Sequence, residues 1–81
     1  MLFERVKKVI AEQLNVEKEE IQPDSVLTTD LGANSLDLYN LIIEFEEEFK
    51  ISIPEEDINK LITVNDVVVY LENLENEKSK I

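Results

Sequence analysis

The apolar residues of this chain recur every three or four positions along three stretches, the spacing that gathers them on one face of an α-helix. The first stretch sets five of them among charged and amide side chains: Phe3, Val6, Val9, Ile10 and Leu14. The second covers residues 35–49, and the third starts after Thr63 and continues to Leu74. The triplet "ISI" at residues 51–53 has no strand partner elsewhere, so we expect a loop there. The spacing therefore predicts an all-α fold.

Local signals add a short helix and mark where the last helix begins. Pro54 suits the first position of a short third helix, because proline lacks the amide hydrogen that this position leaves unpaired. Three acidic residues follow in its first turn, where the helix dipole favours them: Glu55, Glu56 and Asp57. Thr63 and Asp66 resemble a capping box for the final helix. We expect a four-helix bundle of three main helices and one short helix.

The chain ends in the polar stretch "ENEKSKI", which has no apolar period. We therefore expect residues 75–81 to form a frayed tail and residues 1–74 to form the domain. A length of 81 residues lies at the small end of the single-domain range, so one core is expected.

Residues 15–34 lack a helical period, and they form a long loop between the first two main helices. Loops of about 20 residues in a small domain are usually functional or disordered. Four spaced apolar residues argue against disorder, because they can pin the loop to a core: Ile21, Val26, Leu27 and Leu31. The single glycine, Gly32, gives the backbone the freedom for a sharp turn into the second helix, including positive φ.

The amino-acid composition excludes most catalytic mechanisms and most kinds of metal site. The chain has no cysteine and no histidine, which excludes disulfides, thiolate nucleophiles and zinc-thiolate sites and removes the commonest general base. The stretch "DLGANSLD" also lacks the alternating oxygen ligands and terminal glutamate of a calcium-binding EF-hand loop. We therefore expect a protein that is not an enzyme and has no dedicated metal site.

The chain is strongly acidic, with 19 acidic and 8 basic residues and a formal charge of −11. Such a charge repels nucleic acid and anionic lipid, so basic proteins are the expected partners, although acidity can also serve solubility alone. No apolar run approaches the roughly 18 residues of a membrane span, and charges interrupt the opening "MLFERVKKVI" where a signal peptide would be apolar. We expect a cytoplasmic monomer without stable membrane insertion.

The second main helix has two apolar faces. Its core stripe consists of Leu38, Leu41, Ile42, Phe45 and Phe49. A second stripe, here called the docking strip, consists of Leu36, Tyr39 and Ile43 and is flanked by Asn40, Glu46 and Glu47. Either this helix is central and packs on both sides, or the docking strip is exposed and its carboxylates steer a basic partner. The small number of elements available to cover two faces favours the exposed strip.

Ser35 stands at the start of this helix, in a chain that has no histidine to activate its hydroxyl. If Asn34 is the N-cap and Asp37 completes a capping box, Ser35 becomes the first helical residue and its hydroxyl points outward. Serine is itself a common N-cap, and local rules leave the two alternatives nearly equal. A phosphodiester would be tolerated at a helix N-terminus, but the nearby carboxylates oppose it, which suggests a linkage made by an enzyme.

Two segments carry the most specific pattern of the chain: "DLGANSLDLYNLIIEFEEEFKISIP" at residues 30–54 and "TVNDVVVYL" at residues 63–71. Together they closely resemble the acyl carrier proteins of dissociated fatty-acid and polyketide synthesis, and the likeness extends from Phe3 to about Leu71. That family folds as a four-helix bundle with a long first loop, in agreement with the periodicity. The resemblance implies a carrier that holds acyl groups as thioesters and delivers them to fatty-acid synthesis enzymes.

When the family motif is matched to this sequence position by position, the resemblance implies that Ser35 is the attachment point of 4′-phosphopantetheine. A separate phosphopantetheinyl transferase would deliver this group from coenzyme A. The thiol that the sequence lacks would arrive on this arm. The resemblance also implies that basic patches of partner enzymes meet the second helix at Leu36, Asp37, Tyr39, Asn40, Ile43, Glu46 and Glu47. The core stripe, together with Val6, Ile10 and Leu71, would part to shelter the acyl chain.

Two positions depart from the family pattern, because Asn34 and Asn40 stand where the family usually has carboxylates. Asn34 keeps the capping geometry without the charge, and Asn40 removes one steering contact. Both departures suit a specialised carrier for an aminoacyl, polyketide or lipid-modification pathway. An alternative from another class is an acidic helical adaptor that has no cofactor and uses only the docking strip.

Overall fold

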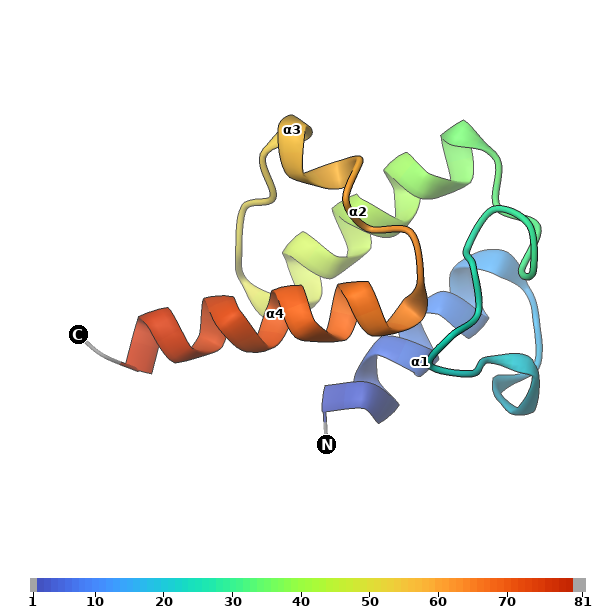
Figure 1. Cartoon of the computed structure of the whole chain (residues 1–81), viewed down its shortest axis with the longest axis horizontal. Helices are drawn as coiled ribbons and strands as arrows, with labels where there is room; N and C mark the ends of the chain where they lie inside the picture. The colour runs from blue at the N-terminus through green and yellow to red at the C-terminus, as the bar shows by residue number, and fades with distance from the viewer. Residues whose placement is uncertain (1, 80–81) are drawn as a thin grey trace.

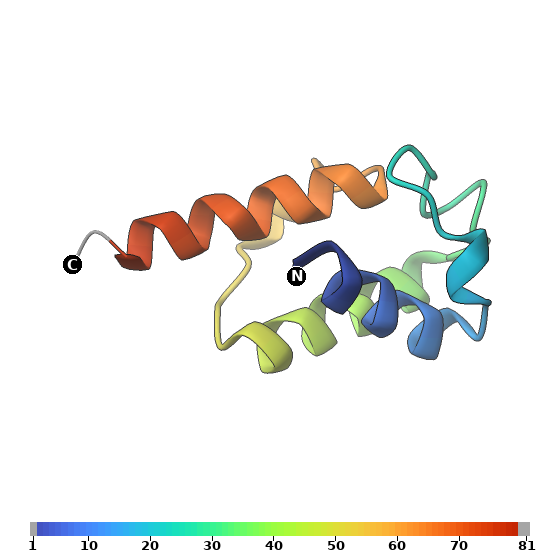
Figure 2. The same cartoon turned by 90° about the horizontal axis from the view of Figure 1, so that it is seen from below.

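The computed structural model describes residues 2–79, and residues 76–79 are described by their backbone alone. Within this range four α-helices surround one apolar core (Figure 1). In chain order the helices are α1 (Leu2–Leu14), α2 (Ser35–Phe49), α3 (Glu55–Ile58) and α4 (Val64–Ser79). α1 packs against both α2 and α4 and so joins the three long helices (Figures 1 and 2). The predicted all-α bundle with three main helices and one short helix is confirmed.

The core is built from side chains of the three long helices and of the first loop. Its largest fully buried side chains are Phe45, Ile10, Ile21, Leu41, Leu71, Val6, Val64 and Val67. The apolar period of α1 thus places Val6 and Ile10 inside, with Phe3, Val9 and Leu14 half-buried around them. The core stripe of α2 is confirmed as well. Leu41, Ile42, Phe45 and Phe49 are buried, and Leu38 is half-buried against the same core.

The loop between α1 and α2 is held in place by its own apolar residues, as predicted. Ile21, Leu27 and Leu31 are buried. Half-buried Val26 pairs with Thr63 in an isolated antiparallel bridge, and the Leu27 amide donates to the Ile62 carbonyl at 3.0 Å. The loop is therefore tied to the start of α4 by backbone pairing that the sequence did not predict. It also contains an unpredicted 3₁₀ turn, η1 (Lys18–Glu20).

Two helix boundaries differ from the prediction. Pro54 is the N-cap of α3 rather than its first residue, and its backbone is extended at φ −61 and ψ 146. α4 continues beyond Leu74 to Ser79, so the predicted frayed tail is helical as far as that residue. Glutamate and lysine are good helix formers and sustain a helix without an apolar face. Residues 80 and 81 lie outside the described range, and the domain boundary at residue 74 stays a prediction.

The start of α4 and the segment before α3 agree with the prediction. The Asp66 amide donates to Thr63 Oγ1 at 3.1 Å, and the Thr63 amide donates to Asp66 Oδ2 at 3.0 Å, which completes the capping box. The segment at residues 51–53 is irregular chain and pairs with no strand of the described residues. Among the helices of residues 2–79, none is both long enough and apolar enough to cross a membrane.

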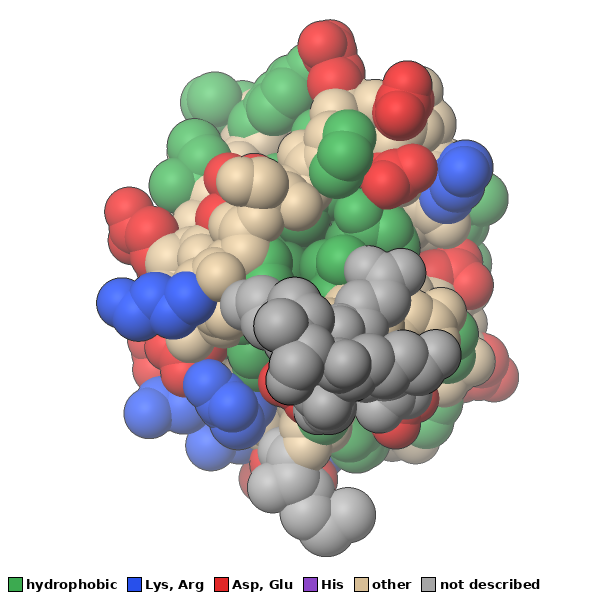
Figure 3. Space-filling view, turned by 90° about the vertical axis from the view of Figure 1, so that its left-hand side faces the viewer, with side chains coloured by type: hydrophobic (Ala, Val, Ile, Leu, Met, Phe, Trp, Pro, Cys, Tyr) green, Lys and Arg blue, Asp and Glu red, His purple; other side chains and the backbone are tan. Residues whose placement is uncertain are grey.

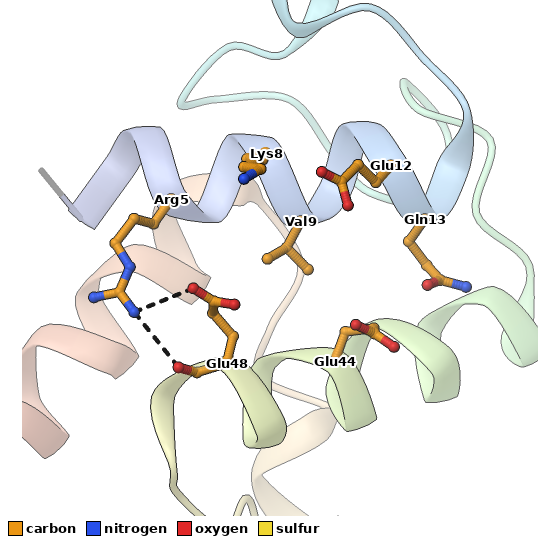
Figure 4. A pocket seen from close by; sticks show the side chains of 7 residues that line it. All are labelled: Arg5, Lys8, Val9, Glu12, Gln13, Glu44 and Glu48. Atoms are coloured by element: carbon orange, nitrogen blue, oxygen red, sulfur yellow. Dashed lines mark hydrogen bonds and ion pairs between the residues drawn. The ribbon is translucent and has the colours of Figure 1, made fainter.

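Arg5 fastens the first turns of α1 to the end of α2 (Figure 4). Its Nη2 donates to Glu48 Oε2 at 3.2 Å and to the Glu48 carbonyl at 3.4 Å. The guanidinium carbon also lies 4.5 Å from the centroid of the Phe49 ring. Beside this pair the two helices border a groove of about 480 Å³, lined mostly by polar side chains such as Lys8 and Glu44. The groove between α1 and α2 is therefore lined mainly by polar side chains and not by core residues.

Candidate functional site

Asn34 is the N-cap of α2, which decides between the two alternatives that the sequence left open. Its Oδ1 accepts a hydrogen bond from the Asp37 amide at 2.9 Å, and its own amide donates to Asp37 Oδ2 at 3.2 Å. Both halves of a capping box are therefore present. Ser35 is the first helical residue, its side chain is exposed, and no residue in the range 2–79 hydrogen-bonds its hydroxyl.

Gly32 makes the turn that leads into α2. Its φ of +73 lies in the left-handed region, whereas a Cβ added at this position would meet nothing within 4 Å. Backbone conformation rather than space therefore requires glycine here. On either side Leu31 and Ala33 are buried, and the Ala33 amide donates to the Leu27 carbonyl at 2.9 Å. The predicted sharp turn is confirmed, and these anchors fix the position of Ser35.

A small hollow opens beside the start of α2. Its volume is about 200 Å³, and it is lined by Thr28, Leu38, Ile58, Asn59, Leu61 and Ile62. Leu38 lies one turn after Ser35 on a neighbouring side of the helix, so the hollow adjoins the serine. The core itself is filled by buried side chains such as Leu41 and Phe45. The parting of this core around an acyl chain stays a prediction.

The docking strip is exposed to solvent. The exposed fractions of Leu36, Tyr39 and Ile43 are 67%, 53% and 49%. These values exclude the alternative in which α2 packs on both sides. Neighbouring exposed apolar side chains with a polar border are typical of interaction surfaces. The role of the docking strip in partner binding stays a prediction.

The polar residues around the docking strip have different surroundings. Glu47 is exposed and Asn40 is half-buried. Asp37 is engaged in the capping box. Glu46 is half-buried, and its Oε2 accepts a hydrogen bond from the Ile53 amide at 2.8 Å. The structure thus brings the predicted partner-binding residues together along α2, but two of their carboxylates already hold backbone amides.

Comparisons with known proteins show the family of the chain. A model of the phosphopantetheine attachment site family matches residues 4–71. The chain is 49% identical over 72 residues to the acyl carrier protein of Helicobacter pylori strain J99. The aligned residues cover 89% of this chain and 92% of that protein. The chain belongs to the acyl carrier protein family. The acyl carrier protein of Campylobacter lari is 45% identical over 74 residues, which cover 91% of this chain and 96% of that protein. The acyl carrier protein of Wolinella succinogenes is 48% identical over 71 residues, which cover 88% of this chain and 93% of that protein.

As an acyl carrier protein, the chain carries acyl groups on a 4′-phosphopantetheine arm, which supplies the thiol that the sequence lacks. The start of α2 fits such an arm. The amides of Ser35 and Leu36 have no acceptor within the helix, and with the helix dipole they favour a phosphate. The capping box also holds an oxygen of the Asp37 carboxylate on the Asn34 amide. Family membership therefore favours a carrier over the cofactor-free adaptor.

Sequence reasoning missed two features of the carrier that shape the segment after α2. Lys50 ends α2 in the left-handed conformation at φ 57, although neither glycine nor asparagine marks that position. Tyr70 Oη donates to Asp57 Oδ2 at 2.7 Å and ties α4 to α3. No local pattern links these two residues, so only their proximity in space reveals the contact.

Replacing Asn34 by alanine is expected to lower the free energy of unfolding of the carrier by about 1 kcal/mol, because the Asp37 amide loses its acceptor. Asn34→Asp should stay within about 0.5 kcal/mol of the wild type, since aspartate caps helices about as well as asparagine. Urea unfolding followed by circular dichroism measures both values. A loss for Asn34→Asp as large as that for Asn34→Ala would show that this cap is not what stabilises α2.

The carrier has far more acidic side chains than its ion pairs use. Its salt bridges include Arg5–Glu48, Lys7–Glu4 and Lys60–Asp57, but 8 basic side chains cannot pair with all 19 acidic ones. Figure 3 shows the Lys and Arg side chains of one end gathered mostly on one side, with acidic side chains around the rest. No group of three or more His, Cys, Asp or Glu in the described residues could hold a metal ion. Self-repulsion is therefore expected to destabilise the fold at low ionic strength.

Added salt is accordingly expected to raise the melting temperature, because counterions screen this repulsion. Mg²⁺ should raise it as well, continuously with concentration rather than with saturation at one equivalent. Thermal unfolding at a series of NaCl and MgCl₂ concentrations measures the effect. An unchanged or lower melting temperature would contradict the electrostatic argument, and saturation at one equivalent would reveal a specific metal site.

Proposed function

We propose that Ser35 is the attachment point of the 4′-phosphopantetheine arm, and that the protein delivers acyl groups to enzymes of fatty-acid synthesis without catalysing a reaction itself. The observation that carries the proposal is the released hydroxyl. Because Asn34 provides the cap, the Ser35 side chain is exposed and has no hydrogen-bond partner in the range 2–79. The chain has no histidine to activate this serine, so a separate transferase must supply the base.

An intact-mass measurement tests the proposal. The apo-protein is incubated with coenzyme A, Mg²⁺ and a broad-specificity phosphopantetheinyl transferase. We expect a gain of one phosphopantetheine, which peptide mapping should locate on Ser35. No gain, or a gain on another residue, would contradict the assignment.

The docking strip, together with Asp37, Asn40, Glu46 and Glu47, receives the transferase and the partner enzymes in this proposal. Its exposed apolar residues supply burial, and the carboxylates attract basic patches and set the orientation of the complex. The net charge of −11 supports partners with positively charged surfaces. The monomeric state and the cytoplasmic location stay predictions from the sequence.

A specialised carrier for aminoacyl, polyketide or lipid-modification substrates is the second candidate. It is favoured by the uncharged Asn34 and Asn40, which lie beside the serine and along the docking strip. Loading of the holo-protein discriminates between the two. Efficient transfer of a malonyl group by a fatty-acid malonyltransferase supports the first candidate, and loading only by an adenylating ligase supports the second.

A further inference from the structure

The side-chain amide of Asn34 has an oxygen end and a nitrogen end, and the structure fixes which of them faces α2. Its Oδ1 accepts a hydrogen bond from the Asp37 amide at 2.9 Å. A backbone N–H only donates, so the oxygen must face the helix and Nδ2 must be the opposite end of the group. Asn34 is exposed, and no residue in the range 2–79 accepts a hydrogen bond from its Nδ2. The N-cap of α2 therefore has a donor group available to a ligand.

This donor group lies beside the place where the arm begins. Asn34 and Ser35 are consecutive residues, and both are exposed. The amides of Ser35 and Leu36 have no acceptor among the described residues either, because they open the helix. Asp37 is the nearest charged residue in sequence, and one of its carboxylate oxygens is held on the Asn34 amide at 3.2 Å. The start of α2 thus combines several unused donors with one carboxylate that repels a phosphate.

We propose that Asn34 Nδ2 donates a hydrogen bond to the phosphate of the arm and so orients the arm at the start of α2. This inference rests on the proposed function, in which Ser35 carries the arm. The covalent bond to Ser35, rather than the helix terminus alone, keeps the phosphate beside Asn34. The free oxygens of a phosphodiester are ionised acceptors, for which an amide N–H is a suitable donor.

The physical reason is the difference between an amide and a carboxylate at the same cap position. Both cap a helix about equally well, because each offers an oxygen to the Asp37 amide. The remaining half of the group differs, since an amide presents a donor to the phosphate and a carboxylate presents a second anionic oxygen. A hydrogen bond to an ionised acceptor is stronger than one to a neutral acceptor. Asn34 therefore offsets part of the repulsion that Asp37 exerts on the phosphate.

The contact restricts the base of the arm and leaves its far end free. A phosphodiester that is held only through Ser35 Oγ can rotate about several single bonds. Together with the amides of Ser35 and Leu36, the Asn34 side chain supplies donors from three consecutive residues, and these limit that rotation. Asn34 is thus a positioning residue for the arm, while the thiol at the other end can still reach partner enzymes.

The side-chain amide signal of Asn34 in a proton–nitrogen NMR spectrum tests the contact directly. The apo-protein is compared with the holo-protein prepared from it with coenzyme A, Mg²⁺ and a broad-specificity phosphopantetheinyl transferase. We expect the Asn34 Nδ2 hydrogens to shift downfield on modification and to exchange with water about threefold more slowly or less, because they gain an ionised acceptor. The side-chain amide of Asn40, farther along α2, is the internal control and should keep its position.

Thermal unfolding of matched apo- and holo-proteins tests the energetic consequence. Asn34→Asp keeps the cap and adds a charge, so the change in melting temperature that the arm causes should be about 3 °C or more below that of the wild type. Asn34→Gly has neither the donor nor the charge and costs the cap little, so it should lie between the two. Asn40→Asp adds the same charge away from the arm and should match the wild type within about 1 °C.

An Asn34 signal that does not move on modification would overturn the proposal. An equal arm-dependent change in melting temperature for the wild type and Asn34→Asp would overturn it too. If the transferase fails to modify a variant, the wild-type spectra still decide, because they need no substitution. Intact mass separates the two levels: a wild type that gains the arm but shows neither effect retains the proposed function, whereas one that never gains the arm contradicts that function itself.

Discussion

Ser35→Ala is expected to abolish the gain of one phosphopantetheine completely. The Ser35 hydroxyl is exposed and unpartnered within residues 2–79. The other serine near α2 in the first loop, Ser25, has an exposed fraction of 7%, and its Oγ accepts a hydrogen bond from the Gln22 amide at 3.0 Å. Ser25 therefore cannot replace Ser35 as the acceptor. Intact mass after incubation with coenzyme A and the transferase measures the loss.

The same substitution should leave the fold intact, since Asn34 rather than Ser35 caps α2. We expect Ser35→Ala to change the free energy of unfolding by no more than about 0.5 kcal/mol, as for other surface substitutions. Ser52→Ala is the matched control, because Ser52 is an exposed serine outside the helices and should not affect modification. Full modification of Ser35→Ala, or its loss in Ser52→Ala, would falsify the assignment.

Phe45→Ala is expected to lower the free energy of unfolding by about 3–5 kcal/mol, through lost burial and the cavity left behind. Phe45 has an exposed fraction of 1%, and its ring centroid lies 6.4 Å from that of Phe49. Since small domains are stable by only about 5–15 kcal/mol, this substitution should bring the protein close to unfolding. Urea unfolding followed by far-ultraviolet circular dichroism measures the change.

Tyr39→Ala is the matched control on the opposite face of α2. Its side chain is 53% exposed, so we expect a loss of stability below about 1 kcal/mol. Binding to the transferase should instead weaken by about tenfold or more, because exposed tyrosines often anchor interfaces. Loss of stability as large as that of Phe45→Ala would mean that the docking strip is part of the core.

The helices and the candidate serine could be predicted because their signals are local. The apolar period of α1 and the Thr63–Asp66 capping box involve residues only a few positions apart, and both are confirmed. The choice of Asn34 or Ser35 as the cap could not be predicted, because either side chain satisfies the local rule. The apolar period predicts an end for α4 near Leu74, whereas the helix continues to Ser79, since its last turns have no apolar face to mark them.

The all-α class, the two apolar faces of α2 and the motif around Ser35 follow from the sequence alone, because helical period and capping are set by neighbours along the chain. The three-dimensional fold reveals which face of α2 is free, since that depends on which elements lie beside it. The fold also reveals the hydrogen bond between the Ile53 amide and the Glu46 carboxylate. That hydrogen bond requires the chain to turn back at Lys50 onto α2, and the left-handed turn has no glycine to announce it.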